Sequence, residues 1–320
     1  MTTHTAGSSL HGGPFPLLGR SVARIGYGMG RLARAAGAGS AGAGTEGAGT
    51  GSPGSARADA VALLRTAFDL GISHFDTAQF YGNGLANDLL REAFAGSRDE
   101  VVIASKAGTR PDPGADIPLT AAQKPAELRT AVEENLRALG TDRIDVMYLR
   151  RMDFTPGLLA EGDQVVPLED QLAELTVLRE EGKILGIGLS HVTAEQLRTA
   201  LPAGIVSVQN IHNLVDRTDE SLLEICAEHG IAWTPYFPLG GGYGQLPRVT
   251  DEEAVRTVAS RLGVTASQVG LAWQLAHSPN TLVISGTASP EHLRENVEAG
   301  ELTLDAEARD ALDAVADRGR

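Results

Sequence analysis

Three residues of complementary chemistry stand just after two short apolar segments of the chain. Asp76 and, five positions on, Tyr81 follow residues 72–75, and Lys106 comes just after residues 101–104. A phenol has a pKa of about 10 and is a weak acid at neutral pH. An ammonium beside it favours the phenolate, and a carboxylate holds that ammonium in place, so the phenol becomes a better proton donor. The set suits protonation of a carbonyl oxygen. The alternative is a rim salt bridge of Asp76 and Lys106 with Tyr81 merely packed.

The elements that must position these residues alternate between short apolar strands and amphipathic helices. We expect strands at residues 22–30, 72–75, 101–104, 143–149, 184–189, 205–208, 231–234 and 281–284, with helices between them and a last helix near 305–316. Eight strands in this rhythm predict a single-domain (β/α)8 TIM barrel of the α/β class. A doubly wound sheet would need a glycine fingerprint opening a helix after the first strand, and that spacing is missing.

The chain divides into a tail, a barrel and an insertion. We expect residues 1–15 to be a flexible N-terminal tail and residues 16–320 to form the barrel. Residues 35–56 are almost entirely Ala, Gly, Ser and Thr, which cannot bury an apolar face, so they predict a flexible insertion after the first barrel strand. This segment should hang over the catalytic rim, either as a tolerated loop or as a mobile lid.

Composition limits the classes of function. The 320 residues are 42% hydrophobic, carry a net charge of −14 and have a pI of about 5.0. An acidic chain without a long apolar run argues against nucleic-acid and membrane partners. With Cys226 as the one cysteine and no signal-peptide pattern in residues 1–10, we expect a cytoplasmic protein. We expect no metal site, a small-molecule substrate, and a monomer or small homo-oligomer.

Further polar or small residues follow the later strands. They are Arg150, Ser190, Gln209, Tyr236 and the pair Gly286 and Thr287. In an α/β barrel, groups at the carboxyl ends of the strands converge on one site.

Five segments, in order, resemble the aldo-keto reductase family over residues 20–300. They are Phe75-Asp76-Thr77-Ala78 with Tyr81-Gly82, Ala104-Ser105-Lys106, residues 186–190 (GIGLS), Val208-Gln209-Asn210 and residues 236–240 (YFPLG). Residues 81–92, 149–152, 234–241 and 287–297 are most similar to the bacterial pyridoxal reductases within that family. The resemblance implies reduction of a carbonyl by NADPH, with Tyr81 as general acid and Asp76 and Lys106 supporting it.

The resemblance also implies a cofactor site. Ser190 and Gln209 would bind the nicotinamide carboxamide, and Tyr236 would stack on the nicotinamide ring. The pyrophosphate would lie along Phe237, Pro238, Leu239 and Gly240. The adenosine end would be held by Gly286, Thr287 and the start of the 290–299 helix, whose amides suit a phosphate, with Glu295 and Asn296 contacting adenine.

The sequence departs from the family pattern in three respects. Arg150 stands where most members have a His; it could stabilise a developing oxyanion, bind an anionic or phenolic substrate group, or be a structural residue paired with Asp153. His191 replaces an Asn that helps hold the carboxamide. Gly286 and His292 replace a Lys and an Arg that contact the 2′-phosphate, so preference for NADPH is inherited from the resemblance.

We therefore expect an NADPH-dependent reductase of a small aromatic or heteroaromatic aldehyde, pyridoxal first. The aromatic residues Tyr27, Phe80, Phe154 and Tyr243 could line a pocket for a flat ring, or any one of them could simply pack within its loop. One alternative is a reductase of a sugar or natural-product carbonyl. Another is an NADPH-binding regulatory barrel with little turnover, which the retention of Asp76, Tyr81 and Lys106 argues against.

Overall fold

Eight parallel strands form the central sheet of the computed structural model, which describes residues 10–38, 53–112, 119–241 and 246–317. Neighbours in the sheet follow the order β11–β10–β9–β8–β5–β4–β3–β12. A parallel bridge between Trp233 and Thr281 joins the two ends of this order, so the sheet closes into the predicted barrel. The strands are β3 (Ile25–Gly28), β4 (His74–Asp76), β5 (Val102–Ala107), β8 (Ile144–Arg150), β9 (Ile184–Ser190), β10 (Ile205–Gln209), β11 (Ala232–Trp233) and β12 (Val283–Ile284).

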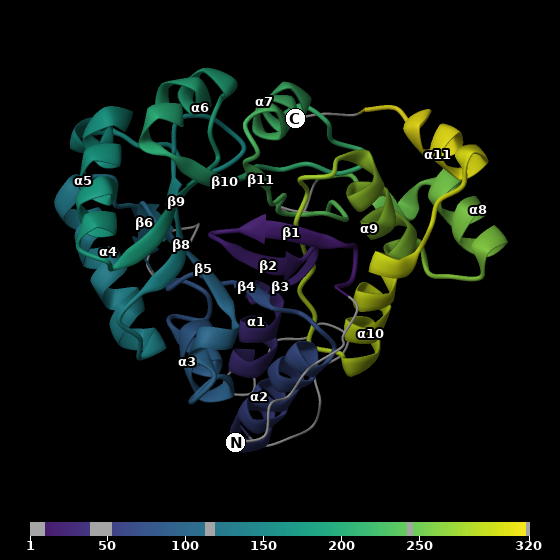
Figure 1. Cartoon of the computed structure of the whole chain (residues 1–320), viewed down its shortest axis with the longest axis horizontal. Coiled ribbons are helices and arrows are strands. Elements are labelled where there is room, and N and C mark those ends of the chain that lie inside the picture. The colour runs from purple at the N-terminus through teal and green to yellow at the C-terminus, as the bar shows by residue number, and fades with distance from the viewer. Residues whose placement is uncertain (1–9, 39–52, 113–118, 242–245, 318–320) are drawn as a thin grey trace.

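Helices follow the strands and surround the barrel (Figure 1). They are α1 (Gly30–Ala38), α2 (Pro53–Asp69), α3 (Leu85–Ala93), α4 (Pro125–Leu139), α5 (Leu168–Glu180), α6 (Ala194–Ala200), α7 (Glu220–Glu228), α8 (Glu253–Leu262), α9 (Ala266–His277), α10 (Pro290–Glu298) and α11 (Ala306–Asp313). Within the described ranges, none of these helices has the length and apolar character needed to cross a bilayer.

Helix α4 illustrates how local signals set the element bounds. Pro125 occupies its first turn, where a missing N–H costs nothing, and the Glu127 carboxylate accepts from the Lys124 N–H at 3.1 Å. Gly140 ends the helix in the left-handed conformation, with φ of 62°. Its buried face presents Leu128, Val132 and Leu139 to the barrel.

The predicted flexible tail is wrong at its C-terminal end. Residues Pro14–Leu17 (β1) pair antiparallel with Arg20–Ala23 (β2), and Phe15 and Leu17 are buried while the two prolines between and before them are exposed. Proline is tolerated here because it faces solvent on an edge strand. The hairpin lies across one end of the barrel, in purple at the centre of Figure 1, and packs on Val102 and Val146.

The prediction of a flexible insertion at 35–56 is also wrong at both of its ends. Helix α1 continues to Ala38 and α2 begins at Pro53, so both ends of the segment are helical. Alanine has the highest helix propensity, and Leu32 and Ala33 anchor α1 in the core, which explains why the low-complexity composition misled the prediction. Residues 39–52 lie outside the described residues.

Two further features complete the fold. A second antiparallel pair of short strands, Thr109–Pro111 (β6) with Leu119–Ala121 (β7), lies beside the carboxyl end of β5. Cys226 is a fully buried member of the main core, and burial raises the pKa of its thiol to about 12.

Candidate active site

Asp76 and Lys106 form a buried ion pair at the carboxyl ends of β4 and β5. The Lys106 ammonium donates to Asp76 Oδ1 at 2.6 Å and to the Thr77 carbonyl at 2.9 Å. The side chains are only 4% and 6% exposed. Gln209, from the end of β10, donates its amide to Asp76 Oδ2 at 2.6 Å. The carboxylate is therefore held on both oxygens, and the two predicted residues meet at one point.

Lys106 stays charged in this buried position. Burial alone would lower the pKa of Lys106, but the negative charge of Asp76 and the neighbouring Tyr81 outweigh it and hold that pKa above its usual value. Because Asp76 and the Thr77 carbonyl fix its position, the Lys106 ammonium can stabilise a negative charge on an adjacent side chain.

Tyr81 lies next to that cation. The Lys106 Nζ atom is 5.1 Å from the centroid of the Tyr81 ring. Phe80 packs edge-on against the ring, with centroids 4.9 Å apart, and Gly30 at the start of α1 lies beside it, where even a Cβ would be only 3.6 Å from the ring. Asp76, Tyr81 and Lys106 are thus brought together as the sequence predicts, with the phenol on the more exposed side of the ion pair.

A buried amide network that the sequence interpretation missed supports the loop between β4 and α3. Asn87 on α3 accepts from the Thr77 hydroxyl at 2.8 Å and donates to Asn135 on α4 at 2.9 Å. Asn135 in turn accepts from the Ser105 hydroxyl at 2.6 Å. Thr77 and Ser105 directly neighbour Asp76 and Lys106 in sequence, so the network fixes both strand ends. The sequence does contain a signal for this network: Asn135 is a polar residue on the otherwise apolar face of α4.

Adjacent arginines at the end of β8 have opposite surroundings. Arg151 donates to both carboxylate oxygens of Asp153, at 2.8 and 2.9 Å, and is buried. The Arg150 guanidinium lies 5.8 Å from the Phe80 ring centroid, and among the described residues no carboxylate is paired with it. The structural alternative of an Arg150–Asp153 pair is therefore wrong. Within the part of the chain that the structure describes, the Arg150 guanidinium thus lies beside Phe80, the residue before Tyr81, without a carboxylate partner.

His191 braces the aromatic side of the rim. Its Nε2 lies 2.9 Å from the Phe154 carbonyl oxygen, which can only accept, so Nε2 carries the proton. Nδ1 is then free to accept from the Tyr236 hydroxyl at 3.1 Å. The imidazole also stacks on the Phe154 ring, with centroids 3.9 Å apart. His191 adopts a positive φ of 61° directly after Ser190, which is buried at the end of β9.

The stretch after β11 turns sharply beside the rim. Phe237 has a φ of 56°, and the Gly240 N–H donates back to the Phe237 carbonyl at 2.9 Å. A Cβ at Gly240 would lie 2.0 Å from the Pro247 carbonyl oxygen, so only glycine fits. Pro238 and Leu239 are half-buried within this turn. The backbone is close-packed in the region predicted to hold a pyrophosphate.

The predicted adenosine end lies at the entry to α10. A Cβ at Gly286 would lie 2.2 Å from the Gly28 carbonyl oxygen, which explains why no lysine stands there. Thr287 is buried and its hydroxyl accepts from the Ser289 N–H at 3.0 Å. The exposed His292 lies one turn before the half-buried Glu295 and the buried Asn296, so the three share a helix face.

One buried polar atom at the rim fits an absent ligand. Among the residues that the structure describes, Gln209 Oε1 has no hydrogen-bond partner, although its amide nitrogen is bonded to Asp76. A buried acceptor left unpaired costs about 1–3 kcal/mol. A carboxamide N–H donor placed here would satisfy it, which is the role predicted for Gln209 with a nicotinamide.

The predicted aromatic pocket is only partly assembled. Tyr27 is fully buried, packs on Phe75 and donates its hydroxyl to the Thr287 carbonyl, so its placement in the pocket is wrong. Strand β3 points this side chain into the core. Phe80 and Phe154 lie at the rim, and Tyr243 lies outside the described residues.

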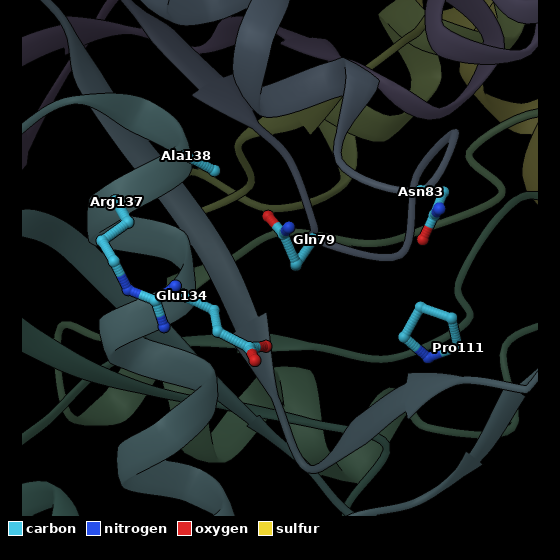
Figure 2. A pocket seen from close by; sticks show the side chains of 6 residues that line it. All are labelled: Gln79, Asn83, Pro111, Glu134, Arg137 and Ala138. Carbon is cyan, nitrogen blue, oxygen red and sulfur yellow. The ribbon is translucent and has the colours of Figure 1, made fainter.

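A separate cavity of about 480 Å³ opens beside the rim. Figure 2 shows Gln79 and Asn83 from the β4–α3 loop facing Glu134 and Arg137 on α4, with Pro111 from β6 at its edge. Its lining does not include Asp76, Tyr81 or Lys106. Because Gln79 also accepts from Asn87 at 2.7 Å, the cavity adjoins the supporting network and not the charged centre.

A closed barrel with a buried ion pair, a phenol and an arginine at its carboxyl rim defines a TIM-barrel enzyme. Residues 41–317 match the model of the aldo/keto reductase family, and the chain belongs to that family. It is 40% identical to pyridoxine 4-dehydrogenase of Escherichia coli K12 over 302 residues, covering 94% of this chain and 97% of that one. It is 36% identical to an uncharacterised oxidoreductase of Schizosaccharomyces pombe, over 79% of this chain and 78% of that one.

Solved structures agree with this assignment. A crystal structure of an aldo-keto reductase from Klebsiella pneumoniae in complex with NADPH superposes with a TM-score of 0.73 at 27% identity, covering 94% of this chain and 93% of that one. The predicted fold and family are confirmed.

Proposed function

We propose that the protein reduces a small heteroaromatic aldehyde of the pyridoxal type to its alcohol with NADPH, and that Tyr81 is the proton donor. The observation that carries this proposal is the buried Asp76–Lys106 pair, whose ammonium lies 5.1 Å from the Tyr81 ring. The 40% identity to an E. coli pyridoxine 4-dehydrogenase over nearly the whole chain supports the substrate class.

In this scheme Tyr81 gives its hydroxyl proton to the carbonyl oxygen of the substrate. The Lys106 ammonium stabilises the phenolate that remains, and Asp76 keeps the ammonium in place. The Thr77 carbonyl accepts from Lys106 and the Gln209 amide donates to Asp76, so both charged groups keep their positions during proton transfer.

Arg150 is assigned to substrate recognition. Its guanidinium cannot lose a proton at neutral pH, so it does not share the acid role of Tyr81. Over the face of Phe80 it offers several donors to a developing oxyanion or to a phenolic oxygen on an aromatic ring. The Phe80 ring beside the Arg150 guanidinium favours a flat, hydroxylated aromatic substrate over a flexible sugar chain.

The residues around the rim fit a nicotinamide cofactor. When bound, NADPH supplies the hydride. Gln209 Oε1 would accept from the carboxamide, Tyr236 braced by His191 would support the ring, and the turn from Phe237 to Gly240 would hold the pyrophosphate. Gly286, Thr287, His292, Glu295 and Asn296 would take the adenosine end. We also place the enzyme in a reducing cytoplasm, in keeping with its single buried cysteine.

The test is NADPH oxidation by the purified protein against a matched panel of carbonyls. We expect kcat/KM for pyridoxal to exceed that for an aldose and for a straight-chain aldehyde of similar size. Pyridine-4-carbaldehyde, which lacks the phenolic oxygen, should fall between them, because it keeps the ring but not the contact to Arg150. An aldose as the preferred substrate would replace this proposal with sugar reduction. Tight NADPH binding without turnover of any carbonyl would replace it with a regulatory barrel.

A further inference from the structure

A second group of reactive side chains, none of which belongs to the Asp76–Lys106 centre, lies between α7 and α9. His212 follows β10, Glu220 begins α7 and His277 ends α9. His212 Nε2 is 3.0 Å from Glu220 Oε2, and His277 Nε2 is 2.7 Å from Glu220 Oε1. The ligand-capable atoms of the three residues all lie within 4.8 Å of one another. The sequence interpretation expected no metal site, and the separations of these residues along the chain gave no motif.

The hydrogen bonds of Gln274 determine which nitrogen of His212 carries a proton. Gln274 donates its amide nitrogen to the His212 carbonyl at 2.6 Å, which turns its Oε1 toward His212 Nδ1 at 3.4 Å. An amide oxygen only accepts, so Nδ1 is the protonated nitrogen. The neutral imidazole then directs the lone pair of Nε2 at the Glu220 carboxylate. A metal ion placed between Nε2 and the carboxylate would be bonded by a lone pair from each.

The surroundings favour a cation that enters from outside. His212 is fully buried and stacks on Trp273, with ring centroids 6.1 Å apart; the Trp233 ring lies nearly perpendicular to it, with centroids 5.8 Å apart. The Glu220 and His277 side chains are 38% and 21% exposed, so one side of the group is open to solvent. An ion held by all three residues would lie at the solvent-facing side of the group, next to Glu220 and His277.

We propose that His212 Nε2, the Glu220 carboxylate and His277 Nε2 bind one divalent transition-metal ion of the zinc class, with solvent completing its shell. Two imidazoles and one carboxylate suit zinc, and a ligating histidine ordinarily donates its other ring N–H to a carbonyl, as His212 does to Gln274. Zinc bonds of about 2.0–2.2 Å place tetrahedral ligand atoms roughly 3.3–3.6 Å apart, so small side-chain rotations open the group around an ion. The ion would tie α7 to α9 outside the catalytic rim.

The test titrates the untagged, chelator-stripped protein with Zn²⁺ by calorimetry and with Co²⁺ by visible absorption. Wild type should bind one ion per chain and show the intense bands of four-coordinate cobalt. His277→Ala and Glu220→Gln should each weaken binding by roughly 100-fold, since each removes a ligand. His229→Ala, which changes an exposed histidine at the end of α7, should bind as wild type does.

A second readout covers variants that fold poorly. Zinc should raise the melting temperature of wild type and His229→Ala but not of Glu220→Gln, whose near-isosteric amide keeps the helix N-terminus. Absence of stoichiometric binding by wild type, or equal binding by His277→Ala and wild type, would overturn the proposal and leave a histidine–glutamate ion pair.

Discussion

The two ends of the barrel interior differ in what they bury. Under the β1–β2 hairpin the interior is an apolar cluster of Phe15, Leu17, Val22, Val102, Val146, Tyr148, Ala232 and Leu282. At the other end it holds the Asp76–Lys106 ion pair. The same strands serve both: β5 begins with Val102 and reaches Lys106, and β8 passes from Val146 to Arg150.

The difference assigns separate tasks to the two ends. Taking an ion pair out of water carries a desolvation cost that its mutual attraction offsets only in part, so the charged end is weak evidence for stability. Apolar burial under the hairpin favours folding by about 25 cal/mol for each Å² removed from water. Stability should therefore respond to changes at the closed end, and turnover to changes at the charged rim.

The largest expected effect is the loss of turnover in Tyr81→Phe. Removing the hydroxyl takes away the proton donor, so kcat for pyridoxal should fall by roughly 10²–10⁴-fold. NADPH affinity, measured by fluorescence titration, and the melting temperature should stay as in wild type, because the ring still packs on Phe80 and Gly30. A variant that keeps half of the activity would refute the assignment of Tyr81.

At the closed end, Phe15→Ala should lower the free energy of unfolding by about 3 kcal/mol and leave kcat unchanged. Phe15 is 9% exposed and lies in the cluster that closes the barrel. Leu185→Ala is the matched control, since Leu185 lies on β9 but is 41% exposed; its cost should stay below about 0.5 kcal/mol. Chemical denaturation measures both. A fall in kcat as large as the fall in stability would contradict the division of tasks.

A neutral histidine near the charged rim gives a pH signature. Burial lowers the pKa of His74 to about 4, against a smaller opposing effect of the Ala23 carbonyl. The unfolded chain takes up this proton at about pH 6.5, so the folded state loses stability as pH falls from about 6.5 to 4, by on the order of 3 kcal/mol. Above about pH 6.5, His74 is neutral in both the folded and the unfolded chain, so it does not make the free energy of unfolding depend on pH. Denaturation of His74→Leu across this range should show a flatter profile; an identical slope in both proteins would contradict the shift.

The smallest effect is expected at Arg150. Arg150→Met should raise KM for pyridoxal by about tenfold, the loss of roughly 1.4 kcal/mol of binding, with the free energy of unfolding unchanged. The guanidinium has no carboxylate partner among the described residues, so its removal breaks no ion pair there. Arg150→His should raise rates on generic aldehydes. If both variants keep the wild-type substrate profile, Arg150 is structural.

The residues of the rim could be predicted because each directly follows an apolar strand in the sequence. Asp76, Lys106, Arg150, Ser190 and Gln209 each follow an apolar run, and parallel strands bring such ends together. What it missed depends on contacts between distant segments or on which way a side chain points. The side chain of Tyr27 points into the core and not into the rim. The β1–β2 hairpin buries its apolar side chains only by packing on the barrel strands.

Composition gave a wrong prediction at both ends of residues 35–56, where helices form in place of the expected flexible segment. The Ala- and Gly-rich pattern gave no indication that α1 would anchor Leu32 and Ala33 in the core. The His212, Glu220 and His277 group could not be predicted at all, because its members come from three elements with no shared spacing.

The most direct measurement pairs turnover with stability in the double variant Asp76→Asn, Lys106→Met. Asparagine keeps an acceptor for the Gln209 amide, and methionine fills the volume of the lysine stem. We predict a fall in kcat for pyridoxal of at least about 100-fold, with a free energy of unfolding within about 1–2 kcal/mol of wild type. A variant that retains a large share of the activity, or that loses activity only because it unfolds, would contradict a catalytic role for the charged rim.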